Sequence, residues 1–172
     1  MELKNKTIVA LVHDLFDDLE LWYPVIRLRE AGANVILAGE KPHMTYKGKK
    51  GLPAKTDIGF DQLHETDFDG MIIPGGYAPD KLRRYSNVKD FVKTMNESNK
   101  PIGIICHAGW VAISAGIMKD RKATSFFAIK DDMINAGADW IDQDVVEDNN
   151  LVSSRNPDDL PVYVKTYISR FK

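Results

Sequence analysis

The sequence contains one cysteine, Cys106, among 172 residues, so no disulfide can form within the chain. This scarcity excludes the disulfide frameworks that stabilise small secreted domains. An uncharged run of about 18 apolar residues, the length that a transmembrane helix needs, is also missing. The first residues, MELKNKTIVALVHD, hold too short an apolar run for a secretory signal. We therefore expect a cytoplasmic protein.

The sequence also lacks an excess of positive or negative charge. Lys and Arg number 23 and Asp and Glu number 25, which gives a formal net charge of −2. Such a balance provides no electrostatic attraction to nucleic acid or to an anionic membrane, so neither is expected as a partner. The composition, with 44% hydrophobic and 28% charged residues, is typical of a globular protein. The length predicts a single domain over residues 1–172.

Apolar, β-branched runs alternate with helical patterns along the chain. A continuous run such as Thr7–His13 is typical of a strand that is buried on both faces. Strands are predicted at residues 7–13, 34–39, 68–76 and 100–106. Helices are predicted from the acidic stretch at 17–20 to the EAGA segment, and over 87–96, 107–116, 131–138 and 157–171. This alternation predicts an α/β fold with a mostly parallel sheet and helices on both faces.

Two segments predict hairpins. Residues 41–57 are rich in Lys, Gly and Pro and indicate an irregular excursion with a hairpin. The stretches DVVED and LVSSR, at 144–148 and 151–155, are expected to pair because Asn149 and Asn150 between them tolerate turn conformations.

Suggestive side chains follow three of the predicted strands. His13 and Asp14 follow the first, a Pro-Gly-Gly turn at 74–76 follows the third, and Cys106 with His107 follows the fourth. In a parallel sheet, the carboxyl ends of the strands meet at one edge, where such folds bind their ligands. We therefore expect these three segments to converge at one functional crevice.

Cys106 lies where a strand turns into a helix with small residues. Backbone N–H groups at a helix start favour a thiolate, and the turn resembles a nucleophile elbow. The alternative is a buried structural cysteine, since free cysteine is among the most buried residue types. His107 beside it is either a general base or a half-exposed histidine without a chemical role. One cysteine and four scattered histidines make a structural zinc site improbable.

Two further features suit a thiol site. Glu20 is a carboxylate within the otherwise apolar stretch LELWYP. It either meets the thiol, sharing a proton that raises the carboxyl pKa and lowers the thiol pKa, or compensates the helix dipole. Gly75 and Gly76 either bring N–H groups to a substrate oxyanion or form a plain tight turn.

The sequence resembles the ThiJ/PfpI family, and looks most similar to its PfpI-type intracellular proteases and glyoxal-detoxifying proteins. The resemblance rests on five segments spread in order along nearly the whole chain: DDLELWYPVIRLREAG, FDGMIIPGGYAPDKLR, KPIGIICHAGW, KDDMINAGADWIDQDVV and LVSSRNPDDLP. It implies a flavodoxin-like α/β sandwich, related to class I glutamine amidotransferases and assembled into dimers or larger rings.

The resemblance also implies roles for individual residues. Cys106 is the nucleophile with His107 as base, and Glu20 is the carboxylate that contacts the sulfur. Gly75, Gly76 and the His107 amide form the oxyanion hole. Asp80 matches an acidic residue that orients the histidine from a neighbouring subunit.

Two departures from the family pattern concern the histidine. Asp80 stands where Glu is usual, and Ala108-Gly109-Trp110 replaces the usual Gly-Pro after the histidine. Tyr77 and Trp110 either line the pocket mouth or are ordinary packing aromatics. Arg155 either pairs with nearby acids or shapes the site.

Three functions remain open at this point. We favour a stress-protective glyoxalase or deglycase, in which the thiolate adds to a reactive carbonyl, because nothing in the chain suggests an extended peptide groove. A cysteine peptidase of PfpI type is the runner-up. A redox sensor or chaperone-like stress protein, in which Cys106 is oxidised, is the third. We expect no cofactor and no metal, a carbonyl or peptide substrate, and a homo-oligomer.

Overall fold

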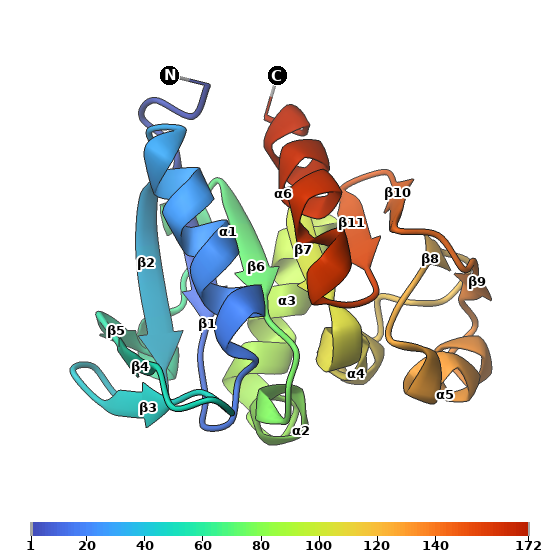
Figure 1. Cartoon of the computed structure of the whole chain (residues 1–172), viewed down its shortest axis with the longest axis horizontal. Helices are drawn as coiled ribbons and strands as arrows, with labels where there is room; N and C mark the ends of the chain where they lie inside the picture. Colours follow the sequence, from blue (N-terminus) through green and yellow to red (C-terminus); the bar gives the residue numbers. More distant parts are fainter. Residues whose placement is uncertain (1, 172) are drawn as a thin grey trace.

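The structure is a computed structural model and describes residues 2–171. Its centre is a seven-stranded sheet in the order β10-β11-β7-β6-β1-β2-β5 (Figure 1). Neighbouring strands are parallel except for the antiparallel edge pair β10–β11. The strands are β1 (Thr7–Leu11), β2 (Asn34–Gly39), β5 (Ile58–Gly59), β6 (Gly70–Ile73), β7 (Ile102–Ile105), β10 (Val145–Asp148) and β11 (Leu151–Ser154).

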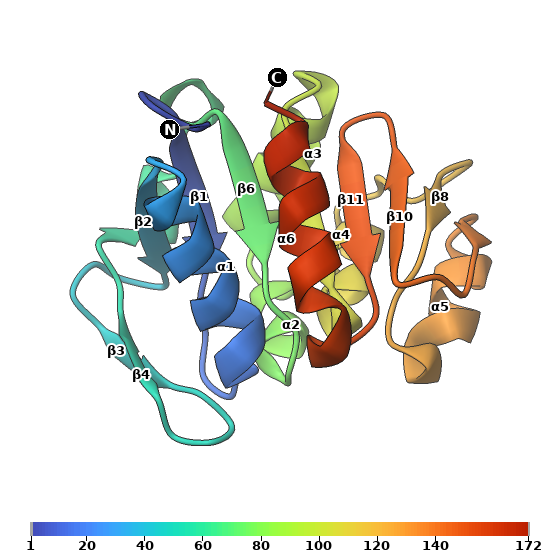
Figure 2. The ribbon, with the colours of Figure 1, turned by 45° about the horizontal axis from the view of Figure 1, so that its top comes forward.

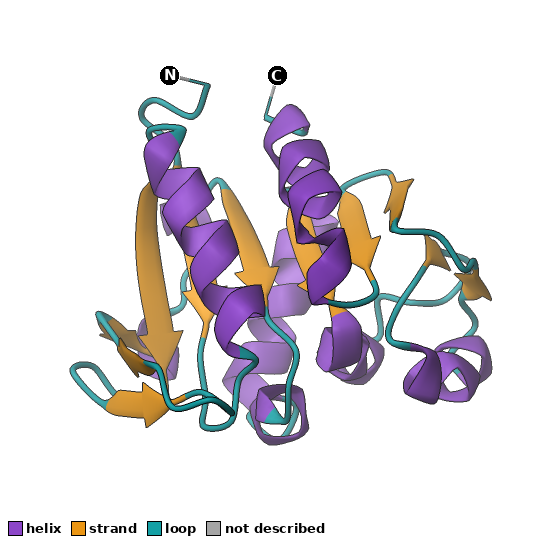
Figure 3. Ribbon diagram, in the orientation of Figure 1, coloured by secondary structure: helices purple, strands orange, loops and turns teal. Residues whose placement is uncertain are grey.

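Helices cover both faces of this sheet, so the predicted α/β arrangement is confirmed. Helices α1 and α6 lie side by side on one face, and α3 lies on the other with the shorter α2 and α4 (Figures 1 and 2). Beyond the β10 edge, α5 lies close to the small strands β8 and β9 (Figure 3). The helices are α1 (Asp18–Glu30), α2 (Ala78–Leu82), α3 (Ser86–Glu97), α4 (Gly109–Ser114), α5 (Lys130–Asn135) and α6 (Leu160–Ser169).

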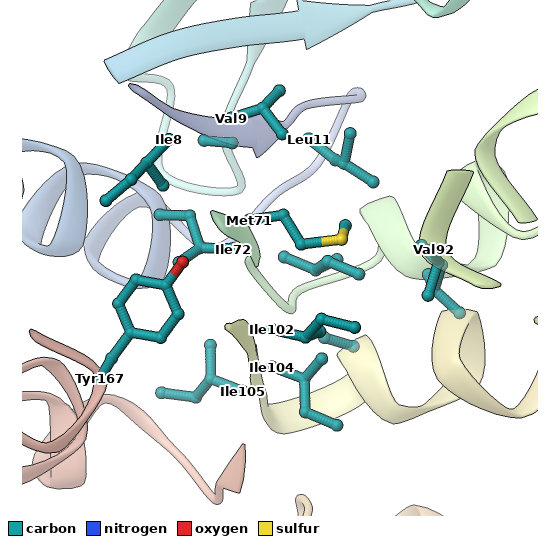
Figure 4. Packing of buried hydrophobic residues seen from close by; sticks show 14 of the residues in the cluster. Ile8, Val9, Leu11, Met71, Ile72, Val92, Ile102, Ile104, Ile105 and Tyr167 are labelled. Carbon is teal, nitrogen blue, oxygen red and sulfur yellow. The ribbon is translucent and has the colours of Figure 1, made fainter. Parts of the chain in front are cut away.

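The core lies between the central strands and the helices. Every residue of β6 and β7 is buried, because helices cover both sides of these strands. Figure 4 shows Ile72 of β6 and Ile102 and Ile104 of β7 packed together, with Tyr167 of α6 at one side and Val92 of α3 at the other. This two-sided burial explains why the predicted strands are continuous apolar runs rather than alternating ones.

Both predicted hairpins are confirmed. The excursion at 41–57 contains β3 (Thr45–Lys47) and β4 (Pro53–Lys55), which pair antiparallel. Strands β10 and β11 are joined at Asn149, whose φ is 50°. The sequence did not predict β5 or the pair β8 (Lys122–Ala123) and β9 (Asp139–Trp140), each of only two residues.

Helix α1 begins at an acidic cap. The Asp17 carboxylate accepts hydrogen bonds from the N–H groups of Leu19 and Glu20, at 3.1 and 3.3 Å. Arg27 and Arg29 lie in the last turn of the helix, where positive charge is favoured. This cap fixes the first turn of α1, and with it Glu20, at the carboxyl edge of the sheet. In residues 2–171, no helix has both the length and the apolar character needed to cross a membrane.

The turn after β6 requires a glycine at position 76. Gly76 has a φ of +75°, and a Cβ atom there would lie 2.5 Å from both the Asp17 nitrogen and the Leu15 oxygen. Left-handed backbone is unfavourable for residues with a Cβ, and backbone atoms cannot move aside cheaply. We expect Gly76→Ala to lower the free energy of unfolding by about 2 to 4 kcal/mol, measured by urea denaturation.

Gly116→Ala is the matched control for this prediction. Gly116 has a similar φ of +74°, but nothing lies within 4 Å of the position of its Cβ. Gly116→Ala therefore measures only the cost of left-handed backbone for a residue with a Cβ atom. We expect this substitution to lower the free energy of unfolding by about 1 kcal/mol. Equal losses in the two variants would contradict the proposed close approach at Gly76.

Candidate active site

A cavity of about 420 Å³ opens at the carboxyl edge of the sheet. Gly76 lies in the turn that follows β6, and Cys106 follows β7 directly, so two of the three predicted segments meet here. The cavity is lined by Asp17, Glu20, Lys49, Gly76, Tyr77, Cys106, His107, Phe126, Asn156 and Pro157. Its position agrees with the rule that open α/β sheets bind ligands beyond the carboxyl ends of their strands.

Cys106 has the backbone of a nucleophile elbow. Its φ is +60°, an unusual value for a residue with a side chain, and only 9% of the residue is exposed. The N–H of Phe126 donates a 3.2 Å hydrogen bond to the Cys106 carbonyl and so helps to hold this conformation. Strained backbone of this kind persists where the surroundings enforce it and is frequent at functional sites. The sulfur therefore faces the cavity although most of the residue is buried.

His107 contacts the sulfur despite being its neighbour in sequence. The Nδ1 atom lies 3.2 Å from Sγ. Burial, and then the positive charge of Lys49, hold the pKa of His107 below its usual value of 6.5. The imidazole is therefore neutral at pH 7, and Nδ1 in its unprotonated tautomer can accept a proton from the thiol.

Glu20 is buried beside the thiol, with 1% of the residue exposed. Its Oε2 atom accepts a 2.8 Å hydrogen bond from the N–H of Gly75, and its carboxyl interacts with the Cys106 side chain. Burial first, and then the nearby negative charge of Asp17, raise the pKa of Glu20 to about 8. The carboxyl therefore keeps its proton at neutral pH, which agrees with the first of the two alternatives that the sequence left open for Glu20.

The second carboxyl oxygen supports this protonated form. Glu20 Oε1 is fully buried and has no hydrogen-bond partner of ordinary geometry within residues 2–171. A carboxylate oxygen in that position would lose its hydration without compensation. A neutral, protonated carboxyl avoids this cost. Glu20 is thus placed as an acid rather than as a negative charge.

The thiol itself differs from the prediction. Burial, and next the charge that Glu20 carries when ionised, raise the pKa of Cys106, whereas the sequence predicted a lowered thiol pKa. The backbone N–H groups of His107 and Gly76 oppose this effect but do not outweigh it. The segment after β7 begins as a 3₁₀ turn, Cys106–Ala108, and α4 starts only at Gly109, so the helix start that was predicted directly after the thiol lies further along the chain. Proton transfer to His107 is therefore needed to generate the nucleophile.

The two glycines have different environments. The N–H of Gly75 is occupied by Glu20, so the predicted oxyanion role does not suit Gly75 in this structure. The N–H groups of Gly76 and His107 are directed at the Cys106 sulfur. These two amides remain candidates for an oxyanion hole, and Gly75 serves instead to hold the carboxyl of Glu20.

Other predicted residues lie outside the cavity. His13 is at the same edge of the sheet, as predicted, but its Nε2 atom contacts the Tyr85 hydroxyl at 3.2 Å, and the residue does not line the cavity. Asp80 lies in α2 and pairs with Arg84. Its approach to a neighbouring subunit's histidine stays a prediction.

Sequence reasoning missed five residues that line the cavity: Asp17, Lys49, Phe126, Asn156 and Pro157. Lys49 enters from the β3–β4 loop, with its Nζ 3.7 Å from the Asp17 carboxylate and 5.6 Å from the Tyr77 ring centroid. That loop has no periodicity, and no local pattern indicates a functional lysine there. Within residues 2–171, no cluster of three metal-ligating side chains is found.

Two aromatic rings hold the imidazole of His107. The centroids of Phe126 and Trp110 each lie 5.1 Å from that of His107, and Trp110 presents an edge-to-face contact. Trp110 is itself held by a 2.8 Å hydrogen bond from its Nε1 atom to Asp132. Of the two aromatic residues whose place the sequence left open, Tyr77 lines the cavity, whereas Trp110 does not line it and packs against His107.

We expect Trp110→Leu to slow the alkylation of Cys106 by iodoacetamide about 5-fold at pH 7, because edge-to-face pairs contribute about 1 kcal/mol and hold Nδ1 beside the sulfur. Trp110→Phe keeps an aromatic edge and should react within 2-fold of the wild type. Intact-mass spectrometry measures both rates, and thermal melting checks that both variants are folded. Equal rates in the leucine variant and the wild type would show that the ring does not position His107.

Comparisons with known proteins agree with this architecture. The model of the DJ-1/PfpI family matches residues 6–170. Deglycase PfpI of Pyrococcus furiosus is 42% identical over 166 residues, which cover 96% of this chain and 99% of that protein. The putative cysteine protease YraA of Bacillus subtilis is 36% identical over 168 residues, which cover 98% of this chain and 99% of that protein.

A solved structure gives the same result for the fold. A two-domain protein from Anabaena variabilis, with DJ-1/ThiJ/PfpI-like and ferritin-like domains, matches with a TM-score of 0.95 and 37% identity. The match covers 96% of this chain and 48% of that chain, so this chain spans about half of the two-domain protein. The predicted flavodoxin-like fold is therefore confirmed.

Proposed function

The chain belongs to the DJ-1/PfpI family, and we propose that it is a cysteine-dependent, stress-protective enzyme that acts on reactive carbonyls, of the glyoxalase or deglycase type. The observation that carries this proposal is the position of the Cys106 sulfur, on a strained elbow with His107 Nδ1 at 3.2 Å and the Glu20 carboxyl on its other side. A base, a nucleophile and an acid therefore surround one small cavity.

The first step is addition to the aldehyde. Cys106 passes its proton to Nδ1 of His107, and Sγ attacks the aldehyde carbon of a compound such as methylglyoxal. A carbon–sulfur bond forms as the carbonyl π bond breaks, and the resulting oxyanion accepts hydrogen bonds from the N–H groups of Gly76 and His107. Protonation of the oxyanion gives a hemithioacetal on Cys106.

The second step moves a proton within the adduct. His107, neutral again after it has protonated the oxyanion, removes the hydrogen of the former aldehyde carbon as a proton while Glu20 protonates the neighbouring carbonyl oxygen, which gives an enediol. His107 then delivers its proton to the neighbouring carbon, and the hydroxyl of the former aldehyde carbon returns a proton to Glu20 as the thioester carbonyl forms. The product is a lactate thioester of Cys106. Attack of water on the thioester releases lactate and restores the thiol. With a glycated side chain as substrate, the free amine or thiol of that side chain is released as well.

The size of the cavity favours this reaction over proteolysis. A volume of about 420 Å³ suits a small molecule or one modified side chain. A cysteine peptidase remains the second candidate, because the relative YraA is named a putative cysteine protease. The same nucleophile would then attack a peptide carbonyl. A redox-sensing role, with Cys106 oxidised to a sulfenic or sulfinic acid, is the third.

Two substrates and one oxidant separate these functions. The purified protein is incubated with methylglyoxal, with a casein-derived peptide, or with hydrogen peroxide, and Cys106→Ser serves as the blank. We expect loss of methylglyoxal and formation of lactate in the wild type only. Cleavage of the peptide without loss of methylglyoxal would establish the peptidase instead. Oxygen additions at Cys106 with neither activity would favour the redox sensor.

We further propose that the protein is a cytoplasmic homo-oligomer in which Asp80 of one subunit approaches His107 of another. Within one chain, Asp80 is half exposed and its carboxylate pairs with Arg84, so it can also face a neighbouring molecule. An experimental structure of the assembled protein tests this directly. If Asp80 lay far from every copy of His107 in that structure, this part of the proposal would be wrong.

A further inference from the structure

A second hollow adjoins the reactive cavity. Its volume is about 330 Å³, and it shares Phe126 and Asn156 with the cavity that holds Cys106. Its lining includes Trp140 of β9 and the residues Arg155 and Asn156, which follow β11. We call it the aromatic hollow and define it by Phe126, Phe127, Trp140, Asp142, Arg155 and Asn156. The proposed reaction has no role for it.

Aromatic rings form one wall of the aromatic hollow. Phe127 is 72% exposed, and its ring centroid lies 4.7 Å from that of Phe126. The Trp140 ring is fixed by a 3.0 Å hydrogen bond from its Nε1 atom to Ser125. The Lys130 ammonium lies 5.0 Å from the Trp140 ring centroid, so this wall already contacts a cation of the chain itself. Aromatic faces of this kind attract positively charged groups.

The opposite wall carries negative charge. Arg155 makes salt bridges with Asp142, at 2.8 Å, with Asp159, at 2.9 Å, and with Asp144. One guanidinium does not neutralise three carboxylates, so this cluster holds two excess negative charges. The side chains of Asp142 and Asp144 are 68% and 66% exposed. Asp142 lines the aromatic hollow, and Asp144 is linked to it through the guanidinium of Arg155.

The reactive cavity lacks this excess of negative charge. It contains the ammonium group of Lys49, but the Asp17 carboxylate lies 3.7 Å from its Nζ atom and offsets its charge. Glu20, which also lines the cavity, keeps its proton at neutral pH. A cationic side chain that reaches this part of the protein is thus attracted more strongly to the aromatic hollow than to the cavity next to it.

We propose that the aromatic hollow binds a lysine or arginine side chain that flanks the modified residue of a polypeptide substrate. This inference rests on the proposed function and specifies its substrate class: carbonyl-modified basic polypeptides are bound better than free small carbonyls. The modified side chain occupies the cavity at Cys106, while the flanking cation lies against Phe127 and close to the carboxylates of Asp142 and Asp144.

Binding is tested first, with Cys106→Ser protein so that no reaction interferes. Fluorescein-labelled peptides acetyl-Ala-Lys-Ala-Lys and acetyl-Ala-Glu-Ala-Glu are titrated in low salt and followed by fluorescence anisotropy. We expect the lysine peptide to bind at least about 5-fold more tightly, which corresponds to about 1 kcal/mol. This preference should decline as salt is added. Equal binding of the two peptides would overturn the proposal.

Three variants in the same Cys106→Ser background locate the site. Phe127→Ala removes the aromatic wall without breaking a salt bridge, and Asp142→Asn with Asp144→Asn removes the exposed charge; both should abolish the lysine preference. Glu30→Gln with Glu97→Gln is the matched control. It neutralises two exposed carboxylates at the C-terminal ends of α1 and α3 and should leave the preference intact. Loss of the preference in the control alone would place the site elsewhere.

Turnover provides the second test. Methylglyoxal hemithioacetals of the peptides acetyl-Cys-Lys-Lys and acetyl-Cys-Glu-Glu are compared as substrates of the protein with Cys106 intact, with free methylglyoxal as reference. We expect kcat/KM to be at least 5-fold higher for the lysine peptide than for the glutamate peptide. Phe127→Ala should lose this preference, while its turnover of free methylglyoxal stays within 2-fold of that of the protein with Phe127. A lysine preference in binding without any turnover would uphold the aromatic hollow and overturn the carbonyl chemistry. Turnover of both peptides with equal kcat/KM would uphold the carbonyl chemistry and overturn the aromatic hollow as a binding site.

Discussion

Replacement of Cys106 by serine is expected to lower kcat/KM for methylglyoxal by at least about 1,000-fold, a typical loss when a catalytic nucleophile is removed. The hydroxyl of serine is a much weaker acid and nucleophile than the thiol, and His107 alone cannot activate it in the same geometry. Lactate formation, followed by an enzymatic assay, measures the effect. The loss should appear in kcat, because the sulfur acts in the reacting complex and contributes little to the binding of substrate.

The serine variant must be folded for this result to be informative. The elbow is held by its surroundings, including the hydrogen bond from the Phe126 N–H to the carbonyl of residue 106, and these contacts do not involve the sulfur. We therefore expect the melting temperature to stay within a few degrees of the wild type. If a folded serine variant retained methylglyoxalase activity, a group other than the Cys106 sulfur would perform the reaction, and the proposed role of Cys106 as nucleophile would be wrong.

The sheet was predictable because its strands satisfy one simple condition. Residues such as Ile102 and Ile104 are covered by helices on both faces, so the strand is a continuous apolar run that can be recognised without a structure. The strands that were missed, β5, β8 and β9, have two residues each. Two residues cannot establish a period, and their pairing depends on tertiary contacts.

The site was predictable in its position but not in its electrostatics. The rule that ligands bind at the carboxyl ends of parallel strands is topological, and it brought Cys106 and Gly76 together correctly. The thiol pKa depends on how deeply the sulfur is buried and on what charge faces it. Burial dominates at Cys106, and no pattern in the segment IGIICHAGW contains that information. Lys49 was missed for a related reason, since an irregular loop carries it to the cavity.

The assignment of Gly75 illustrates how one hydrogen bond changes a role. Gly-Gly after a strand predicts two free N–H groups for an oxyanion. In the structure, a Cβ at Gly75 would lie 2.4 Å from Oε2 of Glu20 and 2.7 Å from Cβ of Cys106. The glycine is therefore needed because the acid and the nucleophile converge on it. The position therefore requires both the absence of a side chain and the amide, which donates its hydrogen bond to Glu20 and not to an oxyanion.

Replacement of Glu20 by glutamine is expected to lower kcat for methylglyoxal about 100-fold, since general acid–base groups contribute about 10²- to 10⁴-fold. Glutamine has nearly the same shape and can still accept the hydrogen bond from Gly75, but it cannot transfer a proton. The pH profile should change as well. In the wild type, activity should fall above the Glu20 pKa of about 8, because the ionised carboxylate then opposes a negative charge on the Cys106 sulfur. The glutamine variant should lack this decline.

The same substitution should increase stability at high pH. Burial raises the pKa of Glu20 from 4.5 to about 8 in the folded protein, so between these pH values the folded state holds a proton that the unfolded chain has released. Stability therefore falls as the pH rises through this window, by an amount on the order of 4 kcal/mol for such a shift. Glutamine does not titrate, so the variant should be progressively more stable than the wild type from pH 5 to pH 9 in urea denaturation. Parallel pH dependence in the two proteins would mean that Glu20 is ionised throughout, and the acid assigned to this site would be absent.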